Sequence, residues 1–266
     1  MYFDNPATAL TTSIERLGEQ AGRQYAAMAR PGFRLERPTG QTAATGQCRL
    51  GGPALLNPET AWPQAGGFPL SLHAILDSGA LAGWLGDALP TPCPGLLNFF
   101  YSDPDVPYET LRQLDIWQPE ACRVVLADPA RAVETAAPAP ARAYPAVPVH
   151  AAGVTMLPDS WDVGDEDVEF DSGKYWGAAS LILDTMADLD GNTADQHCAF
   201  GWPDTSYASR VTSRDTDGPA IHLLQLARDA ELGWSWGDAA TLYFTIPAKS
   251  YWAGDFTAAR LTVQCC

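Results

Sequence analysis

One stretch of the sequence, residues 49–77, constrains the fold more than any other. Its first part is crowded with glycine, proline and tryptophan, and an apolar run then leads to Asp77. Glycine adopts backbone angles that other residues avoid, whereas proline fixes its own φ angle. We therefore predict a shaped loop that leads into a strand. A shorter Gly-Trp-Pro segment at 200–204 and apolar runs within 221–246 repeat this order near the other end.

Each half of the chain thus contains a Gly/Trp/Pro loop, a strand, a variable insert and an aromatic strand, which predicts an internal duplication. The predicted strands are short, and they are rich in branched and aromatic residues that favour sheets. They cover residues 68–76, 96–101, 121–126, 221–228, 242–246 and 261–264. The expected fold class is α+β, with two similar antiparallel-sheet subdomains preceded by a packing helix.

A single amphipathic helix is predicted over residues 6–30. Asn5 can cap it, Pro6 suits the first helical position, and apolar residues recur at steps of three and four. Shorter helices are predicted at 78–89 and 177–190. The segment 128–148 is rich in alanine and proline and is expected to be an extended connector. These features divide the chain into a first repeat with its helix (1–127), a connector (128–148) and a second repeat (149–266).

The net charge of −16 argues against nucleic-acid binding, because phosphate recognition needs a basic surface. Seven of the thirteen residues in the segment 159–171 are carboxylates, among them Asp165, Glu166 and Asp167. This segment is either a surface for a basic partner or a solvated loop. No apolar run is long enough to span a membrane, and the N-terminus lacks the pattern of a signal peptide.

The six cysteines are scattered, and none forms a CxxC pair. We interpret them as reduced thiols in a cytoplasmic protein. No metal or cofactor motif is present in the sequence, and neither is a nucleophile motif. We therefore expect no metal site, no cofactor and no catalytic residue.

Two groups of residues are candidates for ligand or partner binding. Asp77, Gln225 and Asp238 lie at strand ends or turns of the two repeats and could meet in a cleft between them. Aspartates in such places also commonly bond to local backbone groups. The aromatic candidates are Trp62, Trp202 and Trp236, which line binding clefts in some proteins and fill cores in others.

The chain resembles the YwqG-like family, a bacterial domain of unknown function. In the first half the resemblance lies in LGGPALLNPETAWP, GGFPLSLHAILD and GLLNFFYSD, and in the second half it lies in FGWPD, HLLQLARD and WGDAATLYFTI. The family implies a strand that ends in Gln-Ile-Asp in each half. This chain has Ile75-Leu76-Asp77 and Gln225-Leu226-Ala227 instead, so each half keeps one polar residue. The resemblance implies no reaction and therefore assigns no catalytic residue.

Two functional hypotheses follow. The first is a non-catalytic interaction protein, for example an immunity-like protein whose acidic face binds a basic partner. The alternative is an enzyme or small-molecule binder that uses a cleft between the repeats. The missing catalytic motifs favour the first hypothesis. The sequence does not indicate an oligomeric state.

Overall fold

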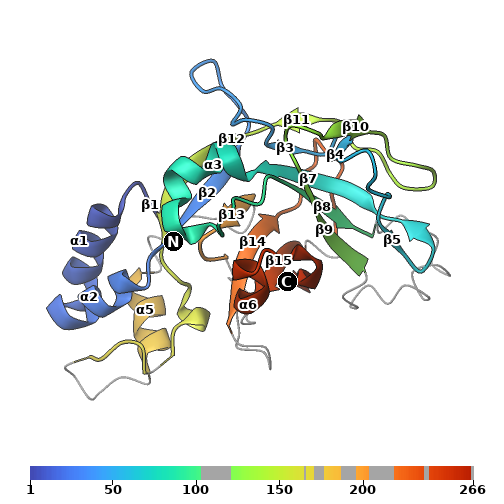
Figure 1. Ribbon diagram of the computed structural model, residues 1–266. Helices are drawn as coiled ribbons and strands as arrows, with labels where there is room; N and C mark the ends of the chain where they lie inside the picture. Colours follow the sequence, from blue (N-terminus) through green and yellow to red (C-terminus); the bar gives the residue numbers. More distant parts are fainter. Residues whose placement is uncertain are drawn as a thin grey trace.

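The computed structural model describes residues 1–102, 121–164, 166–170, 177–186, 196–203, 219–236 and 240–264. Antiparallel strands dominate, and a few helices accompany them, so the fold is α+β as predicted. In Figure 1 the helices α1 (Pro6–Leu17), α2 (Glu19–Ala27) and α5 (Ala178–Met186) form a group at one end of the molecule. Two sheets, named A and B below, make up most of the rest.

Sheet A has seven strands, and each neighbouring pair is antiparallel. The order is β1 (Tyr2–Phe3), β12 (His150–Met156), β2 (Arg30–Glu36), β13 (Cys198–Phe200), β14 (Ala220–Leu226), β15 (Thr241–Pro247) and β16 (Arg260–Gln264). The sheet therefore combines two N-terminal strands, β1 and β2, with five strands from the second half of the chain.

Sheet B has five antiparallel strands, all from the middle of the sequence. The order is β11 (Val147–Pro148), β3 (Arg49–Leu50), β7 (Ser71–Asp77), β8 (Leu96–Tyr101) and β9 (Cys122–Ala127). The segment 128–148, expected as a connector, supplies β11 and also β10 (Val133–Thr135), which pairs with β4 (Ala54–Leu56). One residue separates β11 from β12, so the chain passes from sheet B into sheet A at Val149.

The two sheets pack on each other through one apolar core. Side chains alternate across a strand, so every second residue can face this core. In β8 and β15 these residues are Leu97, Phe99, Tyr101, Leu242, Phe244 and Ile246. The rings of Phe99 and Phe244 meet edge to face, with centroids 5.2 Å apart. The inner face of each sheet is thereby committed to packing.

The outer face of sheet B is covered by a second apolar cluster. Leu72, Ile75 and Phe100 pack there against β4 and the hairpin formed by β5 (Gln64–Ala65) and β6 (Phe68–Pro69). The fully buried Asn98 is satisfied by backbone, because its amide bonds to both the N–H and the C=O of Leu55 at 2.9 and 2.8 Å. The segment before β7 therefore folds back and covers the outer face of sheet B.

The helix predicted over residues 6–30 is wrong in its extent. Asn5 caps α1 by accepting a hydrogen bond from Thr8 N, as predicted, but the helix ends at Gly18, whose φ is 87°. A second helix, α2, then runs only to Ala27, and β2 begins at Arg30. The apolar stripe continues through both helices, which is why the sequence pattern conceals the break. Pro31 is tolerated in β2 because only β12 pairs with the strand there, as at a sheet edge.

Helices α1, α2 and α5 enclose a third apolar cluster, which we call the helical lobe. Tyr25 of α2 is fully buried in it and donates a hydrogen bond from its hydroxyl to Pro158 O at 2.6 Å. Val163 and Val168 of the acidic segment pack into the same cluster. The described part of that segment is therefore anchored on the helices by its apolar residues.

The strand pair β7–β8 of sheet B and the strand pair β14–β15 of sheet A have the same kind of register shift. Each hairpin has a register shift at one place, between Leu72 and Ala74 in β7 and between His222 and Leu224 in β14. Counted from these shifts, the pairs that correspond are Leu72–Phe100 with His222–Thr245, and Ile75–Asn98 with Gln225–Tyr243. The internal duplication stays a prediction, which this correspondence supports.

A close approach of α2 to α1 gives a test of the helical lobe. A Cβ on Gly22 would lie 2.5 Å from Ile14 Cα, so we expect Gly22→Ala to lower the free energy of unfolding. Overpacking of this kind costs about 1–3 kcal/mol. The control is Gly83 of α3 (Ser78–Leu85), where an added Cβ meets nothing within 4 Å. Gly83→Ala should raise stability by up to about 1 kcal/mol, and equal effects in chemical denaturation would contradict the packing.

Candidate functional site

A row of side chains crosses the outer face of sheet A, with one residue from each of five neighbouring strands. Residues that lie directly opposite each other in antiparallel strands share a face of the sheet. The register places in one row Arg34, Cys198, Gln225, Tyr243 and Thr262. The sequence neighbours of Gln225 and of Tyr243 belong to the inter-sheet core. The row therefore points away from sheet B.

A second polar row lies further along the same strands. His222 of β14 is opposite Thr245 of β15, and Thr245 is opposite Arg260 of β16. His222 and Gln225 are fully buried, and Tyr243 and Thr245 are 3% and 6% exposed. Burial of polar groups costs free energy unless they find partners. This face is therefore not simply a solvated side of the sheet.

The corresponding face of sheet B shows what a packing face looks like in this fold. The counterparts of His222, Gln225 and Thr245 are Leu72, Ile75 and Phe100, all in an apolar cluster. At these three positions the two sheets therefore differ in chemistry. The difference is not uniform, because the buried Asn98 of sheet B corresponds to Tyr243, and Cys198 and Trp202 on sheet A pack in an apolar cluster. Packing alone would be served by apolar side chains in both. The polar rows of sheet A are for this reason our candidate site.

His222 presents a hydrogen-bond acceptor on this face. Its Nδ1 lies 2.9 Å from Phe200 O, and a carbonyl oxygen only accepts, so Nδ1 carries the hydrogen. Nε2 is then the unprotonated nitrogen, and it is buried with no hydrogen-bond partner among the residues that the structure describes. Burial lowers the pKa of His222 to about 4, against the hydrogen bond to Phe200 that favours the charged form. The imidazole is thus neutral at neutral pH.

Arg30 and Trp202 form a stacked pair beside the second row. The guanidinium carbon of Arg30 lies 3.5 Å from the centroid of the Trp202 ring, in a cation–π contact. Trp202 is 7% exposed, and its indole Nε1 donates to Met28 O at 2.8 Å, which fixes the ring. Burial lowers the pKa of Arg30, and the carboxylate of Asp162 opposes this effect. Apart from the stack, Arg30 forms no hydrogen bond or ion pair within the described parts of the chain.

The turn that positions Trp202 is strained. Phe200 has a φ of 58°, and no other non-glycine residue among those described has a positive φ. The equivalent turn after β3 has two glycines, Gly51 and Gly52, with φ values of 61° and 80°. A bulky residue in this left-handed region costs about 1–3 kcal/mol, and such strain tends to occur at functional sites. The bond from His222 to Phe200 O helps to hold the strained turn.

The structure brings two of the predicted site residues to this face, Trp202 and Gln225. Gln225 donates from Nε2 to Gln196 O at 3.2 Å. Asp77 lies on the other sheet, where it caps α3 by accepting from Ala80 N and also accepts from Gln47 N, both at 3.1 Å. Asp77 and Gln225 therefore do not share a cleft. Asp238, the third member of that group, lies outside the described residues.

The other predicted residues are spread over three further places. Trp62 packs on Phe100 in the outer cluster of sheet B, and its Nε1 donates to Leu70 O at 2.8 Å. Trp236 lies in the inter-sheet core. Glu166 and Asp167 are exposed on the helical lobe, and Asp165 is outside the described residues.

The inter-sheet core contains an aromatic cluster around His73, which is fully buried. Its ring centroid lies 5.2 Å from Tyr144, 5.4 Å from Trp234 and 6.0 Å from Trp236. Neither imidazole nitrogen has a hydrogen-bond partner within the described part of the chain. Burial, and then the charge of Arg142, lowers the pKa of His73 to about 3. The cluster joins both sheets and is closed on all sides by aromatic rings, as in a packed core.

One buried carboxylate holds the turn that carries Trp234. Asp229 accepts from Arg37 Nη2 at 2.8 Å, from Leu232 N at 3.1 Å and from His197 Nε2 at 3.3 Å. The bond with His197 holds the pKa of Asp229 well below its usual range. His197 Nδ1 accepts from Ala227 N at 3.2 Å, so its ring is fixed at both nitrogens. This arrangement is a structural clamp and leaves no free base.

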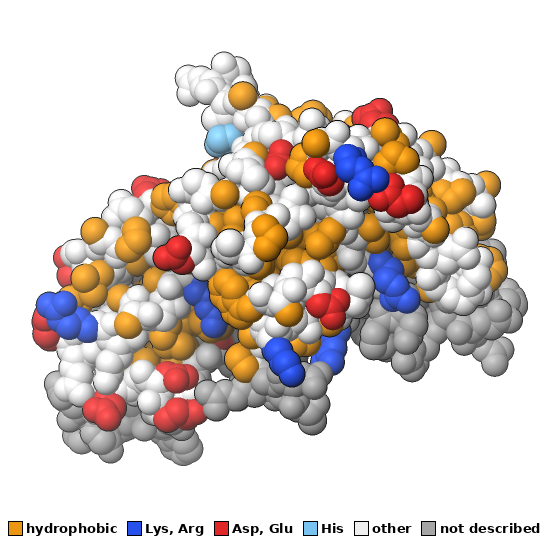
Figure 2. Space-filling model, viewed as in Figure 1, with side chains coloured by type: hydrophobic (Ala, Val, Ile, Leu, Met, Phe, Trp, Pro, Cys, Tyr) orange, Lys and Arg blue, Asp and Glu red, His pale blue; other side chains and the backbone are white. Residues whose placement is uncertain are grey.

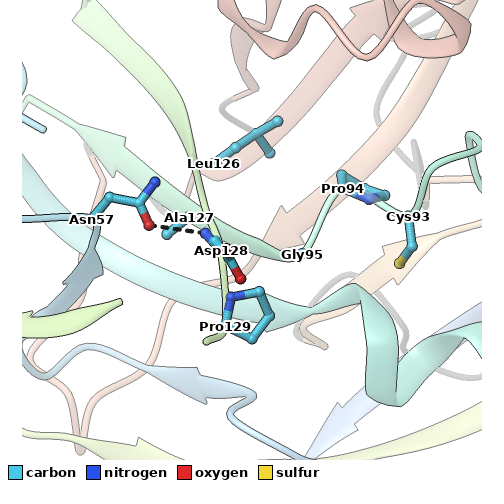
Figure 3. Close-up of a pocket in the computed structure, with 8 residues that line it drawn as sticks. All are labelled: Asn57, Cys93, Pro94, Gly95, Leu126, Ala127, Asp128 and Pro129. Atoms are coloured by element: carbon cyan, nitrogen blue, oxygen red, sulfur yellow. Dashed lines mark hydrogen bonds between the residues drawn. The ribbon is translucent and has the colours of Figure 1, made fainter. Parts of the chain in front are cut away.

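A surface hollow of about 260 Å³ lies where β9 ends (Figure 3). It is lined by Asn57, residues 93–95 and residues 126–129. Asn57 Oδ1 accepts from Asp128 N at 3.0 Å, and Asp128 itself accepts from Ala130 N. These two polar side chains of the hollow thus stabilise local turns. The hollow is a weaker candidate than the outer face of sheet A.

Residues 48–265 match the family model of DUF1963, a domain of unknown function. The chain belongs to this family. The match begins just before β3, so α1, α2 and β2 lie outside it, although β2 sits inside sheet A of the DUF1963 fold. Comparison with curated proteins finds no match.

The described residues of this DUF1963 protein contain no group of three His, Cys, Asp or Glu side chains placed to hold a metal ion. None of their helices has the length and apolar character that a membrane span requires.

The neighbours of Gln225 and Trp202 are residues that our reading of the sequence missed. The signal was present in β15, where Thr241, Tyr243 and Thr245 alternate with apolar residues. Period-two alternation indicates a strand with one polar face. The sequence analysis predicts the run 242–246 only as an aromatic strand and assigns no polar face to it. Arg30 was missed because it was assigned to the end of a helix.

The two buried neutral histidines predict a pH dependence of stability. The pKa values of His73 and His222 are about 3 and about 4 when folded, below the ordinary value of 6.5. The unfolded chain therefore binds more protons as the pH falls through 6.5, and stability is lost. We expect a loss of about 2 kcal/mol per histidine between about pH 7 and about pH 5. Urea denaturation at several pH values should show that His73→Leu and His222→Leu each remove about half of the combined loss from the two histidines. An unchanged slope in the double variant would contradict the buried neutral state.

Proposed function

We propose that this DUF1963 protein is a non-catalytic binding protein that holds a small polar ligand against the outer face of sheet A. One observation carries the proposal. His222, Gln225 and Thr245 are buried at positions where the matching sheet carries Leu72, Ile75 and Phe100. A bound polar molecule explains polar side chains at these buried positions better than packing does.

The chemistry of the face supports binding rather than catalysis. Its groups are an amide, a phenol, hydroxyls, a buried thiol, arginines and a neutral imidazole, and most of them suit recognition through hydrogen bonds. With a pKa near 4, His222 is a weak general base at neutral pH. The buried carboxylate nearest to a histidine, Asp229, is already saturated by Arg37, His197 and backbone amides.

Within DUF1963 we propose a YwqG-like protein of a bacterial cytoplasm. The order of the Gly/Trp/Pro loops and aromatic strands supports the subgroup. Of the 16 basic residues only Lys174 and Lys249 are lysines, a bias typical of GC-rich coding. Cys48, Cys93, Cys122 and Cys198 form no disulfide with one another within the described part of the chain, which suits a reducing compartment.

A retention experiment tests the binding proposal. The full chain is dialysed against the small-molecule fraction of a cell extract, and mass spectrometry identifies what it retains. We expect wild type to retain at least one compound and Gln225→Ile to lose it by about ten-fold or more, because isoleucine copies the packing face of sheet B. Gln64→Ile is the matched control, since Gln64 is exposed on β5. Equal retention by wild type and Gln225→Ile, or no retention by either, would contradict the proposal.

A second candidate function is the binding of a basic protein through the helical lobe. Carboxylates outnumber cations there, as the red side chains over α1, α2 and α5 show in Figure 2. The exposed arginines of the lobe are Arg16 and Arg23. The exposed acidic residues are Asp4, Glu15, Glu19, Glu166, Asp167, Glu169 and Asp184. Complementary charge would speed association with a basic surface.

Charge-reversal variants show whether a basic peptide binds to the acidic surface of the helical lobe or responds only to the net charge of the protein. The probe is an oligo-arginine peptide, and its binding is followed by fluorescence anisotropy at low salt. We expect reversal of Glu166, Asp167 and Glu169 to lysine to weaken binding about ten-fold more than reversal of three exposed carboxylates elsewhere. The control set is Glu59, Asp87 and Glu134. Equal weakening by both sets would show that only net charge acts, and would remove this candidate.

A further inference from the structure

We propose that the ligand held against the outer face of sheet A is a small organic anion, a carboxylate or a phosphate ester, whose charge lies against Arg30. This inference rests on the proposed binding function and names the chemistry of its ligand. It is argued from the charge of the sheet, the state of Arg30 and the acceptor on His222.

The strands of sheet A are locally basic in an acidic protein. Their charged residues are Arg30, Arg34 and Arg260 against Glu36, which gives three positive charges minus one negative charge, or +2. The whole chain has a formal charge of −16. Glu36 is already paired with Arg34, at 3.2 Å from its Nε. Asp162 is the carboxylate next to Arg30, and with it the local sum is +1, which still contrasts with the acidic chain as a whole.

Arg30 is the cation on this face that is best prepared for an anion. Its guanidinium is half-buried and is held flat on the ring of Trp202, so little side-chain freedom remains to be lost on binding. The neighbouring carboxylate, Asp162, acts on Arg30 through its charge but forms no ion pair with it. A partly desolvated guanidinium is strongly stabilised by a bidentate carboxylate or phosphate.

His222 adds a requirement for a hydrogen-bond donor. Its buried Nε2 is an acceptor, because Nδ1 donates to Phe200 O. His222 bonds to Phe200 O, and Trp202, two residues further along the same turn, stacks on Arg30, so both side chains lie at this turn. A molecule that satisfies both carries an acidic group together with a hydroxyl or amine. Hydroxy acids and phosphorylated polyols have this combination.

The test uses the small-molecule fraction of a cell extract, separated by anion exchange into a bound and an unbound pool before dialysis against the full chain. We expect wild type to retain compounds from the bound pool only. Arg30→Gln should reduce that retention by about ten-fold or more, whereas Arg30→Lys should reduce it less because the charge remains. Arg23→Gln is the control, since Arg23 lies exposed on α2 and pairs with Glu19.

The outcomes separate this inference from the binding proposal. Compounds retained from the unbound pool, or full retention by Arg30→Gln, would overturn the anion inference and leave a ligand site in place. Failure to retain anything from either pool would overturn the binding proposal itself. Treatment of the bound pool with phosphatase distinguishes the two sources of charge, because it abolishes retention of a phosphate ester and spares a carboxylate. Circular dichroism and the melting temperature show whether each variant is folded.

Discussion

The packing of two sheets through a shared apolar core determines which side chains of this protein are available for function. Residues alternate across a strand, so the core takes every second position of β8 and β15 and, apart from the register shifts, of β7 and β14. The contact between Phe99 and Phe244 joins the centres of both sheets. Only the outer faces remain for other purposes. Their different chemistry is therefore the most informative feature of the fold.

The outer faces of sheets A and B are covered in different ways. On sheet B, the loop around Trp62 and the pairing of β4 with β10 cover an apolar surface, and Asn98 is satisfied by backbone. On sheet A, a strained turn at Phe200 places Trp202 under Arg30 and accepts a hydrogen bond from His222. Strain, a desolvated cation and an unpartnered acceptor occur within one region. Each of these costs stability, and a bound ligand would offset all three.

The N-terminal segment gives this face its charge. The DUF1963 match begins at residue 48, whereas Arg30 and Arg34 belong to β2, which is inserted between β12 and β13. A strand from outside the matched region thus supplies two of the three arginines of sheet A. In this chain the matched region provides His222, Gln225, Tyr243 and Thr245, and the preceding segment provides Arg30 and Arg34.

The sequence predicts the positions of the strands better than it predicts which side chains share a face of a sheet. Apolar and aromatic runs locate β7, β8, β14 and β15 within three residues, because such runs have few alternatives to a buried strand. The position of β2 could not be predicted, since its partners β12 and β13 are distant in the chain and its Pro31 suggests a break. The loop pattern indicates Trp202, and the polar end of a predicted strand indicates Gln225. Their neighbourhood depends on the register between strands, which a single sequence does not contain.

A crystal structure of the full chain after dialysis against the small-molecule fraction tests the central claim most directly. The account predicts electron density for a non-protein molecule on the outer face of sheet A, in hydrogen-bond contact with His222 Nε2 and with its acidic group on Arg30. Side chains of the protein itself that fill this face and bond to His222 Nε2 would contradict the account. In that case the polar rows would belong to an ordinary, internally satisfied core.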